Sequence, residues 1–309
     1  MATVSVIIPI HNEAESLPRL YEELAQAAGR GAGSWELLFV DDGSRDRTWE
    51  ALRALRARDA RVRPVRLARN FGQTAAMACG IDLARGETIV TMDGDLQNDP
   101  ADIPRLVEKL AEGFDVVCGW RHRRQDKLWT RRIPSMAANL LIGWLTGVRL
   151  HDYGCSLKAY RAEAIKRTPL YAELHRFIPA MSTLTGAAIA ELPVNHRARR
   201  FGRTKYTISR AWRVAFDMVT VSLLIKFAAK PLRFFGALAL GSLAVAALCL
   251  SQSWAWYAGP LREIPLVLPG SALLGLWLAG HLVVVGLVAE LCLRTAHAHP
   301  ERLIAAGAD

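Results

Sequence analysis

The chain has 309 residues and a formal net charge of +10, and 51% of its residues are hydrophobic. This length is ample for a globular domain with a buried core, which excludes a small fold that depends on disulfides. The five cysteines form no Cys-x-x-Cys pair. They argue against a zinc site as well, and we expect reduced thiols.

The N-terminal part alternates between strand-like and helix-like segments. Apolar runs rich in β-branched residues predict strands over residues 4–10, 35–40, 62–67, 87–92 and 114–119. Between them, helices are predicted over residues 15–28, 48–59, 74–84 and 103–112. The alternation predicts an α/β domain with a mostly parallel sheet and flanking helices.

Polar residues gather directly after each of the first four predicted strands. The carboxyl ends of parallel strands meet at one edge of the sheet, and ligands bind beyond that edge. We therefore expect a single binding site. Its four clusters are His11, Asn12 and Glu13; Asp41 and Asp42; Asn70 and Gly72; and Asp93, Asp95 and Gln97.

The fourth cluster is a candidate site for a divalent metal ion. Asp93, Asp95 and Gln97 offer the oxygen ligands that Mg²⁺ prefers while leaving room for phosphate oxygens. An acidic loop that caps a helix is the alternative, because Asp99 followed by Pro100 is typical of a helix start. Both interpretations can hold together. No Gly-x-Gly-x-x-Gly or Walker A sequence is present, so a metal would have to neutralise any bound phosphate.

The positive charge is concentrated in the middle third of the chain. Residues 1–118 carry a net charge of −5, residues 119–233 of +16, and residues 234–309 of −1. Anionic membrane lipids or an anionic lipid substrate are therefore expected partners. Nucleic acid is the alternative, but no DNA- or RNA-binding signature accompanies the basic segment, so we expect no nucleic acid.

Two segments in this part predict helices that lie at a membrane surface. Residues 134–146 are nearly uncharged, and the apolar residues of 208–227 fall near one helix face. Those residues are Ile208, Trp212, Phe216, Val219 and Leu223. Packing against the core of the globular domain is the alternative, and it applies more to the first segment than to the second.

Two long segments near the C-terminus carry no charged residue. Residues 234–261 and 264–289 each exceed the roughly 20 apolar residues that span a bilayer. A pair of helices buried in a soluble core is the alternative, but such helices normally show a polar stripe. We therefore expect a transmembrane hairpin over residues 233–294, with spans of about 234–256 and 266–290.

Basic residues flank this hairpin asymmetrically. Lys226, Lys230 and Arg233 precede the first span and Arg294 and Arg302 follow the second, whereas the connecting loop has only Arg262. By the positive-inside rule both ends are cytoplasmic. The first ten residues lack a basic leader. We expect a multi-pass protein of the cytoplasmic (inner) membrane whose globular domain lies in the cytoplasm.

Seven motifs carry a resemblance to a known family: PIHNE, VDDGS, RNFGQ, DGDLQ, GWR, DYGCSLKAYR and HRARRFGRTKY. In this order they resemble the GT-A glycosyltransferases of family 2. Within that family the chain is similar to the polyprenyl-phosphate glycosyltransferases, a group that includes dolichol-phosphate mannosyltransferases. The match covers nearly the whole chain. It implies a Rossmann-like GT-A domain over residues 1–205, interfacial helices over 206–232, the hairpin, and a cytoplasmic tail over 295–309.

The resemblance implies a nucleotide-sugar donor, with UDP or GDP as its nucleotide. The residues that it assigns to donor binding are Pro9, His11, Asn12, Glu13, Asp41, Asp42, Asn70, Gly72, Asp93 and Gly94. It also implies that Asp93, Asp95 and Gln97 hold Mg²⁺ or Mn²⁺ against the diphosphate. The chain departs from the family at three positions: His11 replaces the usual Tyr, Gly94 the usual Ala, and Thr204 the usual Ser.

A polyprenyl phosphate, such as undecaprenyl phosphate, is the expected acceptor. A phosphate monoester loses its second proton near pH ~6, so it arrives as a ready nucleophile and needs only positive charge to hold it. The resemblance assigns Arg121, Arg131 and Ser135 to the acceptor phosphate, and Arg203 and Lys205 to a loop over the diphosphate or acceptor. The role of Asp152 stays open: it could orient an arginine, interact with the acceptor site or form a structural salt bridge.

The expected reaction is a single displacement that inverts the anomeric carbon, with the ion held by Asp95 and the cationic residues stabilising the leaving diphosphate. A homo-oligomer is a further expectation from the resemblance. Three alternatives remain. A processive polysaccharide synthase usually carries a Gln-x-x-Arg-Trp motif that this chain lacks, and a transferase to a soluble acceptor would not need the hairpin. A dead carrier-binding protein should have lost Asp93 and Asp95.

Overall fold

The computed structural model describes residues 3–31, 33–122, 139–140, 142–143, 147–168, 177–183, 186–197, 231–259 and 266–296. The chain divides into two compact units, residues 1–221 and 222–309. The two predicted interfacial segments, 134–146 and 208–227, lie wholly or mostly outside the described residues.

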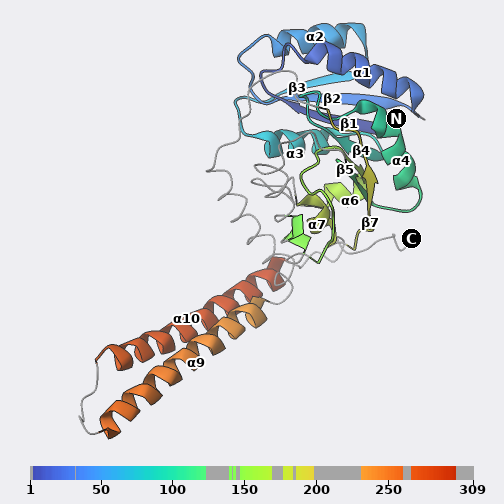
Figure 1. Ribbon diagram of the computed structural model, residues 1–309. Coiled ribbons are helices and arrows are strands. Elements are labelled where there is room, and N and C mark those ends of the chain that lie inside the picture. The colour runs from blue at the N-terminus through green and yellow to red at the C-terminus, as the bar shows by residue number, and fades with distance from the viewer. Residues whose placement is uncertain are drawn as a thin grey trace. The chain divides into compact units, whose positions relative to one another are not determined.

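The first unit, shown in Figure 1, is built on a sheet. The sheet has seven strands in the order β3-β2-β1-β4-β6-β5-β7. The strands are β1 (Val4–Ile10), β2 (Trp35–Asp41), β3 (Val62–Arg66), β4 (Thr88–Thr91), β5 (Val116–Trp120), β6 (Lys158–Arg161) and β7 (Ile189–Pro193). β6 runs antiparallel to β4 and β5, and the other pairs are parallel. The mostly parallel α/β sheet expected from the sequence is therefore confirmed.

The helices of this unit follow the strands in the predicted order. They are α1 (Leu17–Arg30), α2 (Thr48–Arg58), α3 (Gln73–Leu83), the 3₁₀ turn η1 (Pro100–Asp102), α4 (Ile103–Ala111), α6 (Ala162–Lys166) and α7 (Ile178–Ser182). The Asp99 side chain accepts a hydrogen bond from the backbone N–H of Ala101 at 3.1 Å and so caps η1. Asp99 therefore takes the helix-start role, which leaves the metal interpretation of Asp93 and Asp95 open.

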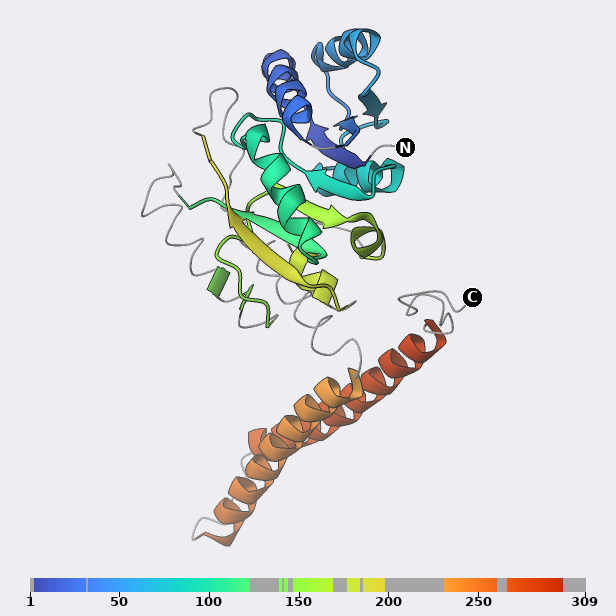
Figure 2. The same ribbon diagram turned by 90° about the vertical axis from the view of Figure 1, so that its right-hand side faces the viewer.

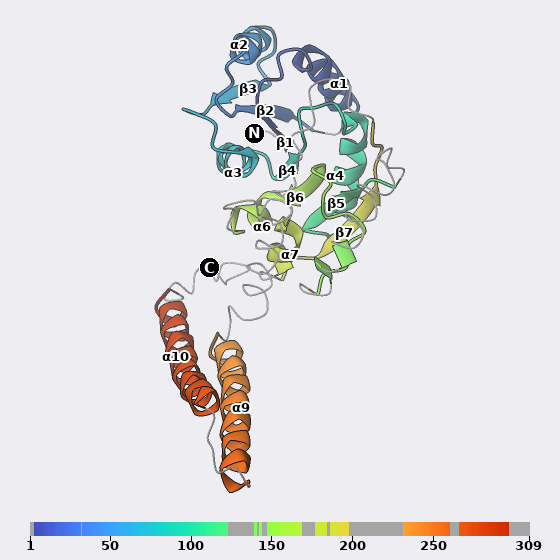
Figure 3. The same cartoon turned by 60° about the vertical axis from the view of Figure 1, so that its left-hand side comes forward.

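Helices cover both faces of the sheet because the side chains of β1 alternate between two apolar clusters. Val6 and Ile8 belong to the cluster that includes α1 and α4, whereas Ile7 belongs to the cluster that includes α3 and α6. Figure 3 shows these helix pairs on opposite sides of the sheet. Gly80 lets α3 approach closely, since a Cβ there would lie 2.4 Å from Cγ2 of Ile7.

The strand directions place several strand ends at one edge of the sheet. β4 and β5 are both antiparallel to β6 and hence parallel to each other. Asp93, just after β4, and Arg121, just after β5, therefore leave the sheet at the same edge. With one strand between them, β4 and β5 are about 10 Å apart.

The second unit, within the described residues, consists of the long helices α9 (Pro231–Ala258) and α10 (Val267–Ala296), which pack side by side (Figure 2). Their seam consists of buried small residues spaced seven apart: Ala239, Ala246 and Ser253 on α9, and Ala272, Ala279 and Gly286 on α10. Heptad spacing keeps one face of each helix toward its partner, and small residues allow close approach. Ser242 Oγ donates to the Gly275 carbonyl oxygen at 2.8 Å across this seam.

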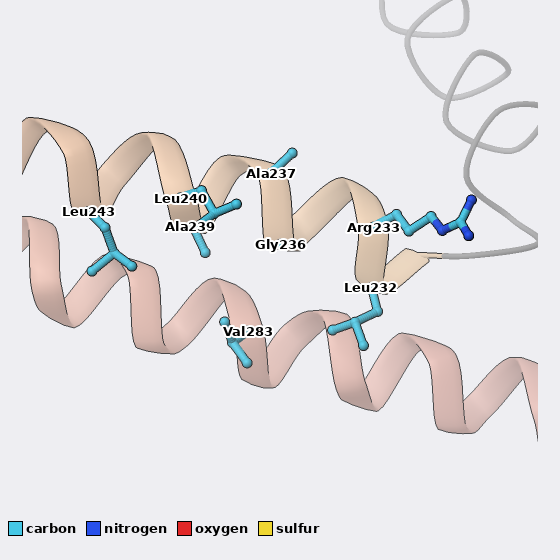
Figure 4. Close-up of a pocket in the computed structure, with 8 residues that line it drawn as sticks. All are labelled: Leu232, Arg233, Gly236, Ala237, Ala239, Leu240, Leu243 and Val283. Atoms are coloured by element: carbon cyan, nitrogen blue, oxygen red, sulfur yellow. The ribbon is translucent and has the colours of Figure 1, made fainter.

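Both helices are long and apolar enough to cross a membrane, and they form a candidate hairpin. In the most apolar part of each, only 11% and 17% of the residues are buried, so large side chains such as Trp254 and Trp277 face outward. An exposed apolar surface of this extent suits a lipid environment. A shallow apolar groove of about 470 Å³ runs along α9. Figure 4 shows two residues of its lining, Leu232, which points from α9 toward α10, and Val283, which lies on α10.

Candidate active site

The loops after β1 and β2 are joined by a set of hydrogen bonds. Asn12, in the left-handed conformation with φ of 58°, donates its backbone N–H to Ser44 Oγ at 2.9 Å, and its Oδ1 accepts from the Arg45 N–H. His11 Nδ1 lies 2.8 Å from the Asp42 carbonyl oxygen. A carbonyl can only accept, so this nitrogen carries the proton. The ring of His11 is therefore fixed against the second loop.

Asp42 joins the second loop to the third. Its carboxylate accepts the backbone N–H of Phe71 at 2.7 Å and of Gly72 at 2.9 Å. Gly43 of the second loop lies against the backbone of the third loop. It has φ of 66°, and a Cβ there would lie 2.5 Å from the backbone carbonyl carbon of Arg69. Only glycine fits this approach of two backbones, which explains the glycine of the VDDGS motif.

Asp41 is fully buried beside this junction. Its Oδ1 accepts the backbone N–H of Ser44 at 2.9 Å, and its Oδ2 lies 3.4 Å from Arg66 Nε. Among the described residues Oδ2 has no hydrogen-bond partner. The ion pair with Arg66 therefore compensates part of the cost of burying this carboxylate.

The loop after β4 carries the candidate metal ligands. Asp93 Oδ1 accepts from Gln73 Nε2 at 2.6 Å, and Asp95 Oδ1 accepts from the backbone N–H of Gln97 at 3.2 Å. The carbonyl of Gly94 accepts from Ser16 Oγ at 3.3 Å. Hydrogen bonds of Asp42, Gln73 and Ser16 thus join the loops that carry the four polar clusters of the sequence. The four clusters lie at one edge of the sheet.

The donor set of this loop fits a hard divalent ion. Asp93 and Asp95 are half-buried carboxylates two residues apart, and neither is engaged in capping η1. Within the described part of the chain no group of three or more His, Cys, Asp or Glu side chains could hold a metal. Two carboxylates leave most coordination positions to water or phosphate oxygens, which is the arrangement that Mg²⁺ favours with nucleotides.

A second cluster follows β5 at the same edge. Arg121 and Asp152 form a two-bond ion pair, with Nε 2.6 Å from Oδ2 and Nη2 2.9 Å from Oδ1. Glu191 on β7 accepts the backbone N–H groups of His151 and Asp152, and the ring of His151 stacks on Trp120 with a centroid distance of 4.4 Å. Arg121 is therefore oriented by a carboxylate that is itself fixed.

The segment between Asp152 and β6 connects the two clusters. The Ser156 carbonyl accepts from Thr91 Oγ1 at 2.9 Å, and Ser156 Oγ accepts from Asn98 Nδ2 at 2.7 Å. Lys158 lies between β4 and β5, paired with Thr91 on one side and Cys118 on the other. Its Nζ donates to the Tyr153 carbonyl at 3.3 Å. Burial lowers the pKa of the Lys158 ammonium.

The cysteines near this segment are free, as are all five in the chain. Burial raises the pKa of the Cys118 and Cys155 thiols to about 12. Both are therefore protonated and inert near neutral pH, in agreement with the reduced thiols expected from the sequence.

The structure describes most, but not all, of the predicted site residues. Pro9 lies in β1 opposite Val40, Asn70 is exposed, and Glu13 accepts from Ser16 Oγ at 2.9 Å. Four residues assigned to the acceptor side lie outside the described residues: Arg131, Ser135, Arg203 and Lys205. Sequence reasoning missed Gln73 and Glu191. Gln73 closes the RNFGQ motif, whereas Glu191 lies in a strand that gave no sequence signal.

Comparison with known proteins identifies the family. Residues 5–169 match the family model described as glycosyl transferase family 2. The chain is 50% identical over 251 residues to dodecaprenyl-phosphate galacturonate synthase of Rhizobium johnstonii, a match covering 80% of this chain and 74% of that protein. It is 44% identical to undecaprenyl-phosphate 4-deoxy-4-formamido-L-arabinose transferase of Pseudomonas aeruginosa, covering 70% of this chain and 64% of that one.

A solved structure shares the fold. Glucosyl-3-phosphoglycerate synthase from Mycobacterium tuberculosis, in complex with Mn²⁺ and UDP-glucose, has a TM-score of 0.55 and 20% identity. The alignment covers 72% of this chain and 78% of that one. The GT-A fold expected from the motifs is thus confirmed, and the chain belongs to glycosyltransferase family 2.

Proposed function

We propose that the protein transfers a sugar from a nucleotide-sugar donor, UDP- or GDP-linked, to polyprenyl phosphate with inversion of the anomeric carbon. The names of the relatives support the acceptor class, since each contains a polyprenyl phosphate. The observation that carries the proposal is the shared edge of the sheet, at which a carboxylate pair follows β4 and an oriented arginine follows β5.

The donor would lie over the loops after β1 and β2. His11, Asn12 and Asp42 are fixed to one another by hydrogen bonds, so this surface is formed before any ligand binds. A pre-formed surface reduces the entropy lost on binding. Pro9 and Glu13 would lie near the base and ribose, and the buried Asp41 would support this surface by accepting the backbone N–H of Ser44.

A divalent ion would be held by Asp93 and Asp95, with Gln97 beside them. When bound, the ion supplies positive charge that stabilises the diphosphate as it leaves. Gln73 holds the Asp93 carboxylate through a 2.6 Å hydrogen bond, which sets the orientation of that ligand. Titration of transfer against each ion distinguishes Mg²⁺ from Mn²⁺.

The acceptor phosphate would be held by Arg121. Asp152 occupies Nε and Nη2 of this guanidinium, so its plane and direction are fixed before the acceptor arrives. Arginine suits the geometry of phosphate oxygens. Arg131, Ser135, Arg203 and Lys205 would complete the cationic surface. Asp152 acts in this proposal by positioning Arg121, and no general base is needed because the phosphate is already ionised.

The two apolar helices would anchor the catalytic domain to the cytoplasmic (inner) membrane. A lipid-linked phosphate stays at the membrane surface, so an anchored enzyme can reach it without extracting the isoprenoid tail from the bilayer. The basic residues that flank the helices support an orientation with both ends in the cytoplasm.

A donor screen tests the proposal. The purified protein in detergent or nanodiscs is given Mg²⁺ or Mn²⁺, undecaprenyl phosphate and one radiolabelled donor at a time, among them UDP-glucose, UDP-galacturonate and GDP-mannose. Transfer of label to the lipid fraction with at least one donor is expected, and it should be lost in Asp95→Ala. No transfer from any nucleotide sugar would contradict the proposal.

A further inference from the structure

The segment after β7 lies against the loop that carries the candidate metal ligands. Residues Asn195, His196 and Arg197 form what we term the strap. His196 makes an isolated β-bridge with Asn98, and the backbone N–H of Arg197 donates to the Gln97 carbonyl at 2.9 Å. The strap therefore pairs with the chain immediately after Asp95 and Leu96.

Side chains of the strap reinforce this pairing. The guanidinium of Arg197 forms two ion pairs. Its Nη1 lies 2.5 Å from Oε2 of Glu23 on α1, and its Nη2 lies 2.8 Å from Oδ1 of Asp99. Asn195 donates its side-chain amide to Asp99 at 2.9 Å and its backbone N–H to Asp102 at 2.7 Å. The side chain of Arg197 is 29% exposed and that of Asp99 is 15% exposed, so these contacts are partly shielded from water.

The turn held by the strap has an unfavourable backbone conformation. Leu96, between Asp95 and Gln97, has φ of 62°, a region that residues with a Cβ rarely adopt. Its side chain is 4% exposed and packs in the main apolar cluster. A non-glycine residue persists in such a conformation only when its surroundings determine it, and such positions gather at functional sites.

We propose that Arg197 and Asn195 are positioning residues that hold the Asp95–Gln97 turn in the geometry that binds a divalent ion. Without their contacts to Asp99 the turn relaxes toward an ordinary conformation at Leu96, and Asp95 moves out of place. The inference rests on the proposed function, because it takes Asp93 and Asp95 as the metal ligands.

Binding of Mn²⁺, measured by electron paramagnetic resonance without any sugar donor, tests the role of the strap. Arg197→Met removes both ion pairs and keeps the length of the side chain. Arg19→Met is the matched control, because Arg19 also pairs with Glu23, at 3.1 Å, but has no contact with Asp99 among the described residues. We expect Arg197→Met to weaken Mn²⁺ binding about tenfold, as loss of a residue that orients a ligand does, and Arg19→Met to leave it unchanged.

A cycle with Leu96→Gly tests the strain itself, since glycine accepts a positive φ without penalty. In the Leu96→Gly background, Arg197→Met should weaken Mn²⁺ binding by a smaller factor than in the wild type. An equal factor in both backgrounds would overturn the proposed role of strain.

Binding by Arg197→Met within twofold of the wild type would overturn the positioning role, and so would equal losses in the two arginine variants. If Arg197→Met does not fold, Asn195→Ala takes its place in the same comparison. Asp95→Asn separates the two levels of the argument. If Asp95→Asn binds Mn²⁺ as the wild type does, both the metal assignment and the positioning role of the strap are wrong. If Asp95→Asn loses Mn²⁺ binding while Arg197→Met keeps it, only the positioning role of the strap is wrong.

Discussion

The guanidinium of Arg121 and the carboxylate of Asp152 meet through two parallel hydrogen bonds of 2.6 and 2.9 Å, although the residues are 31 positions apart in the chain. The side chain of Asp152 is 3% exposed and that of Arg121 is 15% exposed. The sequence allows three roles for Asp152. In the structure its carboxylate forms a buried ion pair with Arg121, the arginine expected to bind the acceptor phosphate.

Asp152→Asn should weaken acceptor binding more than donor binding. The amide cannot accept both guanidinium bonds, so Arg121 loses its fixed direction, and breaking a buried pair costs on the order of 3 kcal/mol of stability. We expect the KM for polyprenyl phosphate to rise at least about tenfold while the KM for the donor stays near its original value. Initial rates over both substrate concentrations, with a thermal unfolding curve, measure the two effects.

Asp115→Asn is the control for this variant. Asp115 pairs with Arg161 at 3.5 Å, but both side chains are at least one-third exposed, so loss of the pair should cost well under about 1 kcal/mol. Equal changes in the two KM values of Asp152→Asn would show that the ion pair does not serve the acceptor.

Gly94→Ala should reduce transfer even though alanine is the usual residue of the family at this position. A Cβ at Gly94 would lie 2.6 Å from Cγ2 of Ile10, a β-branched side chain with little freedom to move. The loop must shift by some tenths of an ångström, which displaces Asp93 and Asp95. We expect a loss of about tenfold in rate, with a higher Mn²⁺ requirement. Rates unchanged across a Mn²⁺ titration would contradict this.

Lys158→Met should alter how stability depends on pH. Burial lowers the pKa of the Lys158 ammonium below its ordinary value of 10.5. Between the lowered folded pKa and 10.5, the unfolded chain binds a proton that the folded chain lacks, so stability rises with pH in this interval. The variant lacks this rise. Its Tm should exceed that of the wild type most at neutral pH, with the difference shrinking toward pH 10.5.

Lys166→Met provides the comparison for that experiment, because Lys166 is exposed and bonds the Ala84 carbonyl at the surface. A constant Tm difference between Lys158→Met and the wild type from pH 7 to pH 10 would disprove the contribution of Lys158 to the pH dependence.

Gly275→Leu should destabilise the helix pair, whereas Gly280→Leu on the same helix should not. A Cβ at Gly275 would lie 3.1 Å from the Cβ of Ala246, but a Cβ at Gly280 meets no atom within 4 Å. Overpacking a closely packed seam costs typically about 1–3 kcal/mol. Thermal unfolding in nanodiscs measures the difference, and equal Tm values for the two variants would contradict the small-residue seam.

Much of the first unit follows from local sequence pattern. The runs that form β1, β2, β4 and β5 are mostly apolar, α1 and α4 are amphipathic, and the polar clusters lie at or shortly after the ends of strands. These features depend on neighbouring residues, so the parallel α/β sheet and its ligand-binding edge could be predicted. The C-terminal helices were equally readable, because two long uncharged segments need no tertiary information.

β6 and β7 could not be predicted in this way. β6 has four residues, KAYR, whose lysine is buried only because β4 and β5 flank it, and β7 contains Glu191, whose role depends on His151 and Asp152. β4 and β5 are equally short, but their residues are mostly apolar, whereas β6 and β7 contain charged residues and have no clear strand pattern. The place of β6 and β7 is therefore decided by the neighbours with which they pair.

The sequence by itself determined the family motifs, the order of the first five strands and the helices between them, and the polar residues that gather at one edge of the sheet. Only the tertiary structure decided that Asp152 pairs with Arg121 and that Gln73 donates a hydrogen bond to Asp93. It also decided that Arg197 pairs with Asp99, close to the turn at Leu96. The physical reason is distance along the chain. Local pattern is written in consecutive residues, whereas a hydrogen bond between remote side chains exists only once the sheet has brought their strands together.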